Sequence, residues 1–465
     1  MMDAKIMPTI KQRIQQFLWG QVDTRYLSMY RVGFALILLK DVLYGFAQAD
    51  LYTDGGFVPR ALMVDLTTIR WSWLYLNGSA WYFYVFLSLW ALVLVALMLG
   101  WRTRTMLVLN VLCLGSLMAR NPLAINGGDQ VLLAMNVWLL FLRVDGYYSV
   151  DAHHGRGATH TTAFPLRVAQ VYFISIYGFT ILHKTLRSQP LISWWDGNAL
   201  YHILQQTSYI SPIGEWLWHT LPAYTWQILT HGTLIFEAGF VVIMLGFFWN
   251  PILRALALIS GLLFHTGIAI VMAIRNFAPV MIWHYLIFLP PLANTPQNLT
   301  RADRLRALLA CGLLLIYLWW GLHNVALSAN DDQTVIPAPP SALVTLIEQV
   351  GIAHEWAMFA SPSIAHVYTR VTIQTDTGST HDAFSGDTPS ATPYRVWWGI
   401  ERRYVRFYQE MMGVDADLQR SWALFYCRTQ DAAIVRIDRY RVWTINPDET
   451  AYALNRRQVI ELTCP

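Results

Sequence analysis

The sequence predicts an all-α polytopic membrane bundle of about nine spans that carries a small C-terminal α+β domain outside the membrane. Hydrophobic residues make up 55% of the 465 residues and charged residues only 13%, whereas a soluble domain has roughly 25% charged residues. Apolar stretches long enough to span recur up to residue 325, and alternating strand-like patterns appear only after residue 350. This composition excludes disorder and an ordinary soluble enzyme, and a net charge of +4 excludes nucleic acid as a main partner.

The first segment, residues 1–26, is predicted to be cytoplasmic and amphipathic. It carries Lys5, Lys11 and Arg13 and has no long apolar core, so it is not a signal peptide. Its stretch TIKQRIQQFLWG is predicted to form a short helix on the membrane surface.

The predicted transmembrane domain covers residues 27–325. Its apolar stretches are 27–47, 81–99, 105–119, 130–143, 167–187, 227–249, 252–272, 277–291 and 306–325. Several are only about 14–16 residues long, which is short for a span, so the range is about eight to ten spans.

Basic residues predict the orientation, because loops on the inside of the membrane are enriched in Lys and Arg. With the N-terminus inside, the inside segments hold Lys5, Lys11, Arg13, Arg25, Arg102, Arg104, Arg156, Arg254, Arg301, Arg304 and Arg306. The outside loops hold Arg60, Arg70, Arg120, Arg187 and Arg275. We therefore expect an integral protein of a bacterial cytoplasmic membrane, with its C-terminal domain outside.

After the last span the pattern changes to a Pro-rich linker, residues 326–340, and an extracytoplasmic α+β domain, residues 341–465. HVYTRVTIQTD, AAIVRIDRYRVWTI and RQVIELTC alternate like strands, and YRVWWGIERRYVRFYQEMM and DLQRSWALFYC between them read as amphipathic helices. Cys427 and Cys464 are a candidate disulfide, since the outside compartment is oxidising. Cys113 and Cys311 lie in spans and are read as packing residues.

Polar side chains within the spans gather near the outer face. Each charged residue at a span centre costs roughly 2.5–3.5 kcal/mol, so each needs a reason. Lys184, Glu237 and His265, from three different spans, all fall in the outer half of the bilayer. Further candidates close to them are His183, His231 and the loop residues Arg120, Asn126 and Asp129. This convergence predicts a cavity that opens outward.

Each of these polar residues also has a structural interpretation. Lys184 can extend to the outer interface, Glu237 can neutralise a basic residue, and His265 can be a satisfied packing residue of the bundle. Lys40 and Asp41 are adjacent in sequence and are read as structural partners of other spans. The His-rich loop HHGRGATH lacks acidic or Cys partners, so no metal site is predicted.

The segments also resemble, in order, the HTTM domain shared with vitamin K-dependent γ-glutamyl carboxylases. The resemblance is carried by RVGFALILLKDVLY with LYTDGGFVPR, by RNPLAINGGDQVLLAMNVWLLFLRVDGYYSVDA, by AQVYFISIYGFTILHKTLRSQPLISWWDGNALY, by HGTLIFEAGF, by FHTGIAIVMAIRNFAPVM and by HEWAMFASPS. It covers about residues 25–385. Lys184 falls where those enzymes carry the lysine that deprotonates vitamin K hydroquinone.

The resemblance implies a carbon–carbon lyase with quinol epoxidase activity. The cofactor would be reduced vitamin K or another membrane quinol, and the partners would be the lipid bilayer and an exported polypeptide carrying the Glu to be carboxylated. His265 and Glu237 would orient the quinol, and Trp194, Trp195 and Asp196 would close the outer mouth of its site. Two positions depart from the pattern: Gly128 stands where the carboxylases carry a histidine, and 266–269 read Thr-Gly-Ile-Ala in place of polar residues. The outside domain is also smaller.

Three other functions remain open from the sequence. A non-catalytic accessory protein that matures an exported peptide, with a cavity that binds lipid or quinone, would have the same topology. A transporter would show inverted repeats and polar residues at all depths, and neither is seen. A haem oxidoreductase would need two facing His, and no spacing selects a pair.

Overall fold

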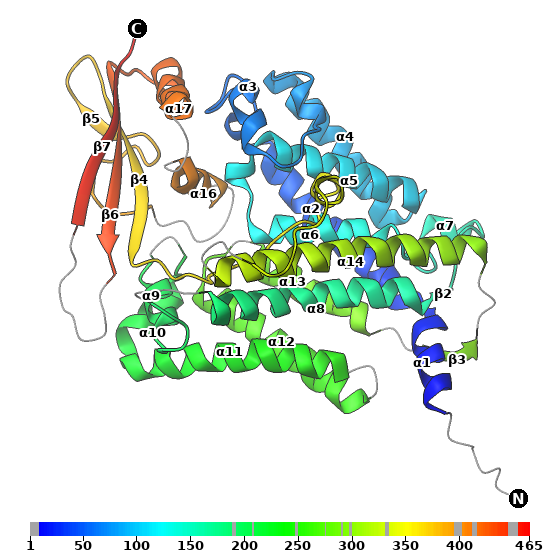
Figure 1. The fold of residues 1–465 in the computed structure, drawn as a ribbon. Helices are drawn as coiled ribbons and strands as arrows, with labels where there is room; N and C mark the ends of the chain where they lie inside the picture. The colour runs from blue at the N-terminus through cyan, green and yellow to red at the C-terminus, as the bar shows by residue number, and fades with distance from the viewer. Residues whose placement is uncertain are drawn as a thin grey trace, which may run out of the picture.

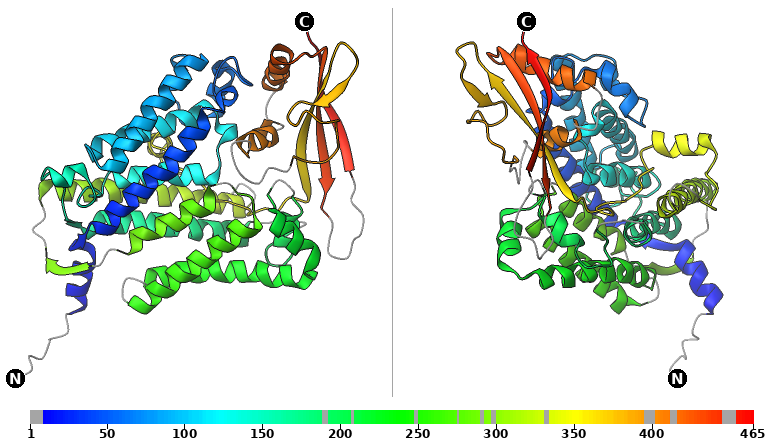
Figure 2. Two further views of the ribbon diagram at one scale, coloured as in Figure 1. Left: turned by 180° about the vertical axis from the view of Figure 1, so that it is seen from behind. Right: turned by 60° about the vertical axis from the view of Figure 1, so that its left-hand side comes forward.

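The computed structural model is mostly helical and ends in a small β-sheet (Figure 1). It describes residues 9–187, 192–206, 209–246, 250–274, 276–289, 292–296, 300–330, 334–394, 402–411, 416–444 and 454–465. The predicted Arg275 lies outside these residues. The long helices form one body, and the sheet stands at one end of it (Figures 1 and 2).

The N-terminal helix α1 (Ile10–Trp19) confirms the predicted short amphipathic helix. It starts with a capping box in which Thr9 accepts from the backbone N–H of Gln12 and the Gln12 side chain accepts from that of Thr9. After α1, the strand β1 (Gly20–Asp23) pairs antiparallel with β2 (His160–Thr162) and β3 (Leu292–Pro296). This three-stranded sheet was not predicted.

A helix occupies each of the nine predicted apolar stretches. They are α2 (Arg25–Gly45), α4 (Ala80–Leu99), α5 (Thr103–Arg120), α6 (Gly127–Leu139), α8 (Ala163–Leu186), α11 (Ala223–Gly246), α12 (Pro251–Val271), α13 (Phe277–His284), which η5 (Tyr285–Phe288) continues, and α14 (Arg301–Ala329). Local signals fix their ends: Ser79 caps α4 and Gly100 ends it in the left-handed conformation. Pro251 occupies the first turn of α12.

Within the described residues, five helices are long and apolar enough to cross a membrane: α4, α8, α11, α12 and α14. The segment 277–288 is apolar but shorter. The helix α2 carries Arg31, Lys40 and Asp41 along its length. Five helices are thus compatible with an integral membrane protein, and the count of nine spans stays a prediction.

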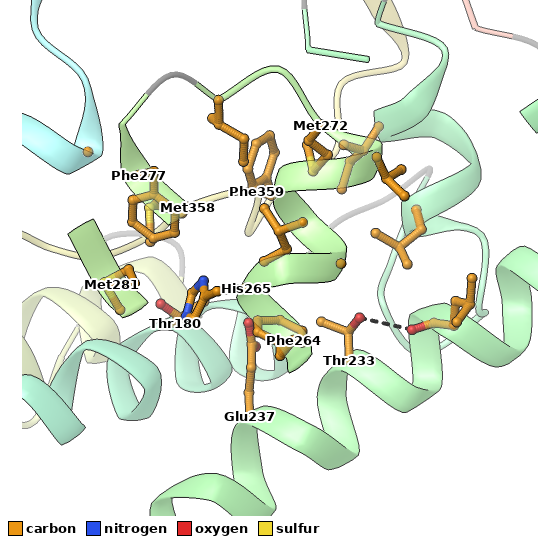
Figure 3. A pocket seen from close by; sticks show the side chains of 18 of the residues that line it. Thr180, Thr233, Glu237, Phe264, His265, Met272, Phe277, Met281, Met358 and Phe359 are labelled. Atoms are coloured by element: carbon orange, nitrogen blue, oxygen red, sulfur yellow. Dashed lines mark hydrogen bonds between the residues drawn. The ribbon is translucent and has the colours of Figure 1, made fainter. Parts of the chain in front are cut away.

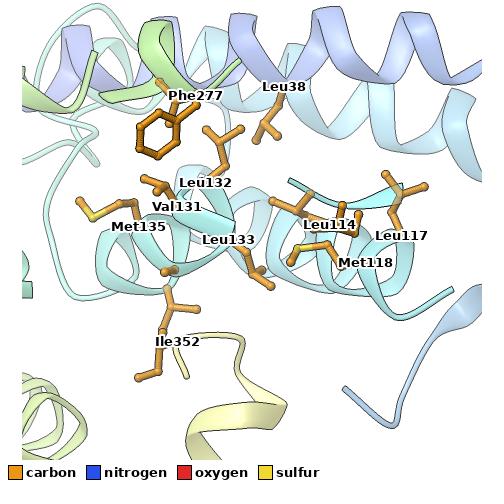
Figure 4. Packing of buried hydrophobic residues seen from close by; sticks show 14 of the residues in the cluster. Leu38, Leu114, Leu117, Met118, Val131, Leu132, Leu133, Met135, Phe277 and Ile352 are labelled. Atoms are coloured by element: carbon orange, nitrogen blue, oxygen red, sulfur yellow. The ribbon is translucent and has the colours of Figure 1, made fainter. Parts of the chain in front are cut away.

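The short helix α6 is the centre of the packing (Figure 4). Every residue from Val131 to Leu139 is buried, against α5 on one side and α13 on another. Ile352, from the segment before the sheet, packs beneath Leu133 in Figure 4. Because protein and not lipid surrounds α6, this helix does not need the length of a span.

The chain has two distinct ends along the long helices. α1 and the three-stranded sheet mark the N-terminal end, which joins segments before α2, before α8 and before α14 (Figure 1). The opposite end, which we call the sheet-domain end, holds α3 (Arg60–Met63), α9 (Ala199–Leu204) and α10 (Pro212–Thr220). The 3-10 helices are η1 (Ala49–Leu51), η2 (Val64–Leu66), η3 (Trp73–Tyr75) and η4 (Pro122–Ala124), and η4 contacts α16 of the sheet domain. The remaining short helix α7 (Val150–His153) lies near the N-terminal end.

The C-terminal domain is an antiparallel sheet of order β5-β4-β6-β7, with two helices on one face. Its elements are β4 (Ala365–Gln374), β5 (Thr380–Asp382), α16 (Arg402–Glu410), α17 (Ala416–Thr429), β6 (Ile434–Trp443) and β7 (Leu454–Thr463). The long strands and both helices occupy the sequences predicted for them.

Two boundaries differ from the sequence prediction. The last long helix continues to Ala329, four residues into the predicted linker. The helix α15 (Ser341–Gln349) belongs with the helical body, because Gln349 bonds the backbone of Thr68 and Arg70 there. The sheet therefore starts only at Ala365, after a segment that crosses the sheet-domain end.

A disulfide joins Cys427 at the end of α17 to Cys464 after β7, as predicted. It closes a loop with a sequence separation of 37, and cross-linking a loop of that size contributes about 2–4 kcal/mol to stability. We expect Cys464→Ser to lower the melting temperature of the C-terminal domain. Thermal unfolding monitored by protease sensitivity of that domain measures it. Unchanged melting under reducing and oxidising conditions would contradict the expectation.

Candidate functional site

A cavity of about 350 Å³ lies toward the sheet-domain end, between α8, α11, α12 and α13 (Figure 3). Its walls are mainly apolar, with Phe264, Phe277 and Met281 among them. Met358 and Phe359, from the segment that leads to the sheet, cover one side in Figure 3. A volume of this size falls within the roughly 300–1,000 Å³ of small-molecule sites.

The charged groups of the cavity are Lys184 on α8 and Glu237 on α11. The Lys184 Nζ donates to Glu237 Oε1 at 2.6 Å, and the two side chains are only 4% and 6% exposed. The Lys184 Nζ also lies 4.1 Å from the centre of the Trp194 ring, a cation–π contact. The second carboxylate oxygen of Glu237 has no hydrogen-bond partner among the described residues. One acceptor of this buried pair is therefore unused by the described residues.

Tyr177 and His265, which line the same cavity, belong to a hydrogen-bonded chain of three side chains that ends at Tyr285. Tyr177 Oη contacts His265 Nε2 at 2.7 Å and Tyr285 Oη at 2.7 Å. The other ring nitrogen of His265, Nδ1, is buried and has no partner within the described part of the chain. His265 thus offers a ligand one free nitrogen while Tyr177 holds its ring.

Helical periodicity explains why these residues meet. On α8, Tyr177, Thr180 and Lys184 follow a spacing of three and four and share one face. On α11, Trp226, Thr233 and Glu237 are spaced by seven and four on the face toward α8. The cavity forms where these two faces meet α12.

The cavity reaches the outer surface of the helical body between α11 and α12. Leu229 and Leu263 line it, yet 45% and 67% of these residues are exposed. Gly267, on the next turn of α12, also lines it and is exposed. Since α11 and α12 are both membrane-crossing by length and composition, this opening faces laterally from the helices.

Five of the predicted site residues line the cavity. They are Lys184, Glu237, His265, Trp194 and Asn126. Trp194 is buried and donates its indole N–H to the backbone oxygen of Phe359 at 2.9 Å. The Asn126 side chain caps α6 by accepting from Gly128 N and Asp129 N.

The other predicted residues on α8, α11 and the loop between them lie outside it. His183 turns to α14, where its Nδ1 meets Ser328 Oγ at 3.2 Å. His231 is exposed and bonds the backbone oxygen of Trp195 at 3.1 Å. Trp195 is itself 64% exposed, and Asp196 accepts backbone bonds within its own turn.

Asp129 serves the contact between the two parts of the chain, whereas Arg120 is bonded within the helical body. Asp129 forms an ion pair with Arg403 of α16 at 3.1 Å, and both side chains are 3% exposed. Arg403 Nη1 also donates to Tyr52 Oη at 3.1 Å and to the backbone oxygen of Ala124 at 3.3 Å. Burial alone lowers the pKa of Arg403, but Asp129 and Tyr52 outweigh it and hold the pKa above its ordinary value. Arg120 is fully buried and bonds Val58 O and Asp54.

Lys40 and Asp41 of α2 form a second group of charged side chains, and their contacts are structural. Lys40 donates to the side-chain oxygen of Asn276, and the Asn276 amide donates to Asp41. Lys40 and Asp41 also contact each other at 3.5 Å. The cluster ties α2 to the start of α13.

Several cavity residues were missed by the sequence analysis. Tyr177 and Thr180 precede Lys184 by seven and four residues, so a helical wheel centred on Lys184 would have found them. Met358 and Phe359 carry no comparable signal, because their place in the cavity depends on tertiary packing.

Gly128, for which the resemblance to the carboxylases had implied a histidine in their pattern, is closely packed. A Cβ there would lie 3.1 Å from the backbone nitrogen of Phe277 and 3.0 Å from Asn126 Oδ1. A histidine side chain would have to displace the start of α13. His265, on a different helix, supplies the imidazole of this cavity instead.

Among the described residues, no group of three or more His, Cys, Asp or Glu is placed to hold a metal ion. Comparison of the chain with protein-family models, curated proteins and solved structures finds no match. The chemistry of the cavity therefore has to be argued from its own side chains.

Proposed function

We propose that this chain is a quinol-dependent membrane enzyme similar to the vitamin K-dependent γ-glutamyl carboxylases. The single observation that carries the proposal is the buried Lys184–Glu237 pair in an apolar cavity that opens between α11 and α12. An apolar quinol dissolved in the bilayer would enter through this opening. A charged pair inside a largely apolar site needs a function, because replacing such pairs by apolar residues is often neutral or stabilising.

In the proposed reaction, Lys184 is the base. Transfer of its shared proton to Glu237 leaves a neutral amine, which accepts a proton from a quinol hydroxyl. His265 Nδ1 would bond the ligand, and Tyr177 and Tyr285 would hold the His265 ring. Trp194 packs over the lysine and limits access of water.

The resemblance supplies the remaining steps. A bound quinol would supply, together with O2, a base strong enough to remove a γ-proton from a Glu side chain, which would then take up CO2. In sum, quinol, O2, CO2 and a Glu residue give the quinone epoxide, water and γ-carboxyglutamate; the quinol is oxidised and O2 is reduced.

The proposal includes nine spans, with the N-terminus inside and the C-terminal domain outside a bacterial membrane. Its support is geometric: β1, β2 and β3 come from three segments that this topology assigns to one side. The loops before α4 and α6 contact the sheet domain at the opposite end, through Ser421 with Phe57 and Arg403 with Ala124. An exported polypeptide would then reach the cavity from the sheet-domain side.

Filling the mouth of the cavity tests the binding site. A Cβ at Gly267 meets no atom within 4 Å, and the same holds for Gly312 on α14, which does not line the cavity. We expect Gly267→Phe to abolish the rise in melting temperature that vitamin K quinone gives the wild type, because ligand binding to the native state stabilises it. Gly312→Phe is the matched control and should keep the rise. An equal rise in both variants would remove this cavity as the quinone site.

A further inference from the structure

The ion pairs of the four-stranded sheet lie on one of its faces. Arg370 pairs with Asp382, Arg436 with Glu461 and Arg456 with Asp438, at 2.9, 2.9 and 2.7 Å. The strand register places all of these residues on the same side, since directly opposed residues share a face and alternate residues repeat it. Each arginine on this paired face has an acidic partner.

The other face carries arginines without such partners. Near α16 and α17 it is apolar, with Val371, Val435 and Ile437 fully buried. Beyond them it carries Arg439, Arg441 and Arg457, which we call the arginine triad. Within the described residues, no acidic side chain forms a salt bridge with any member of the triad.

The triad is electrostatically unfavourable as it stands. Arg439 lies directly opposite Arg457 in the register, and like charges opposed across strands are destabilising. Burial and then the neighbouring Arg441 and Arg457 lower the pKa of Arg439. The Arg439 Nε is buried and makes no hydrogen bond to the described residues. Arg441 and Arg457 are exposed, so an anionic ligand can reach all three.

The strand that carries Arg457 is the free edge of the sheet. Among the described strands, β7 pairs only with β6, and all five residues from Leu454 to Gln458 are exposed. An extended polypeptide can add to such an edge through its backbone, and its alternate side chains then point to one face.

This end of the sheet adjoins the helical body. The residue after β6, Thr444, meets His202 of α9 at 2.9 Å. The strand β4 begins six residues after Phe359, which lines the cavity. A segment held along β7 would thus be anchored at the part of the domain that leads to the cavity.

We propose that the arginine triad and the free edge of β7 bind an acidic, extended segment of the polypeptide substrate as an added strand. Its acidic side chains, at alternate positions, neutralise the triad. The choice of a polypeptide rests on the proposed function, and the edge of the strand favours it over a lipid surface. Anionic lipid would need no strand edge, and the triad shares its face with α16 and α17, which turn toward the helical body.

Direct binding tests the inference without any quinol chemistry. The full-length protein in phosphatidylcholine nanodiscs is titrated against a fluorescent peptide of alternating Glu and Val, and against the same peptide with Gln for Glu. We expect Arg439→Gln, Arg441→Gln and Arg457→Gln combined to weaken binding of the Glu peptide by about tenfold or more. The matched control, Arg436→Gln with Glu461→Gln, removes an ion pair from the paired face and should leave binding unchanged.

Three results would overturn the inference: equal binding of the Glu peptide by the triple variant, equal binding of the Gln peptide by the wild type, or triad-dependent binding of phosphatidylglycerol vesicles without peptide binding. The triple variant removes the like-charge repulsion within the triad, so its melting temperature should not fall. Peptide binding without quinol epoxidation would keep the docking surface and remove the proposed reaction. Epoxidation together with peptide binding that does not depend on the triad would keep the proposed reaction and remove the docking surface.

Discussion

Replacing Lys184 by Met should both destabilise the protein and abolish its quinol chemistry. The change leaves Glu237 buried without its ion-pair partner, and breaking a buried pair in this way costs about 3–5 kcal/mol. Loss of a general base lowers turnover by about 10²–10⁴-fold. The melting temperature and the rate of quinol epoxidation measure the two effects separately.

The double variant Lys184→Met with Glu237→Gln separates stability from chemistry. It removes both charges, so we expect most of the lost stability to return because no unpaired charge stays buried. Its epoxidation should remain as low as that of Lys184→Met. If the double variant turned over within about tenfold of the wild type, Lys184 would not be the base.

Replacing Arg403 by Met should detach the C-terminal domain from the helical body. Arg403 is buried, pairs with Asp129 and bonds Tyr52, so its removal takes this ion pair away from a buried carboxylate at the interface. The expected cost is about 3–5 kcal/mol. Protease sensitivity of the segment between α15 and β4 and the melting temperature would report it.

The matched control for Arg403 lies on the same helix. Arg406 pairs with Glu410 at 2.8 Å, and its Nη1 donates to Tyr209 Oη of the helical body at 3.1 Å. The Arg406 and Glu410 side chains are 37% and 39% exposed, and exposed pairs contribute about 0–1 kcal/mol. Arg406→Met should therefore leave the domain attached. If Arg403→Met and Arg406→Met changed protease sensitivity and melting temperature equally, the role assigned to the Arg403–Asp129 pair would be contradicted. The double variant with Asp129→Asn should cost less than the sum of the two single changes.

The Arg403–Asp129 contact also explains how the domain can influence the cavity. Asp129 Oδ2 accepts from the backbone N–H of Asn126 at 3.1 Å, and Asn126 lines the cavity. Displacing Arg403 would free the carboxylate that fixes this wall. A fall in epoxidation by Arg403→Met that Arg406→Met does not share would support this coupling.

The sequence was sufficient to predict the helical elements, because apolar stretches and their caps are local signals. It also identified the polar residues within the predicted spans whose burial requires a partner or a function. The structure brings three of them, Lys184, Glu237 and His265, together. The pairing itself depends on how α8, α11 and α12 pack. The sheet β1-β2-β3 escaped prediction because its strands are too short for an alternating pattern to be recognised.

Two predicted site residues acquired different roles for the same reason. Asp129 and Arg120 lie in the loop expected beside the cavity, but nothing in the sequence near them pointed to Arg403 or Asp54 as partners. Arg403 is 274 residues away from Asp129, and only the docking of α16 on η4 joins them. The charged residues of this loop indicated the correct end of the molecule, but they did not identify Arg403 or Asp54 as partners.

The central claim is tested most directly by quinol epoxidation. The purified protein in detergent would receive vitamin K hydroquinone, O2, bicarbonate and a Glu-containing peptide, and the epoxide would be quantified. We predict epoxide from the wild type and none from the folded Lys184→Met, Glu237→Gln variant. Folded wild-type protein that binds the quinone at the Gly267 cavity yet forms no epoxide would contradict the account.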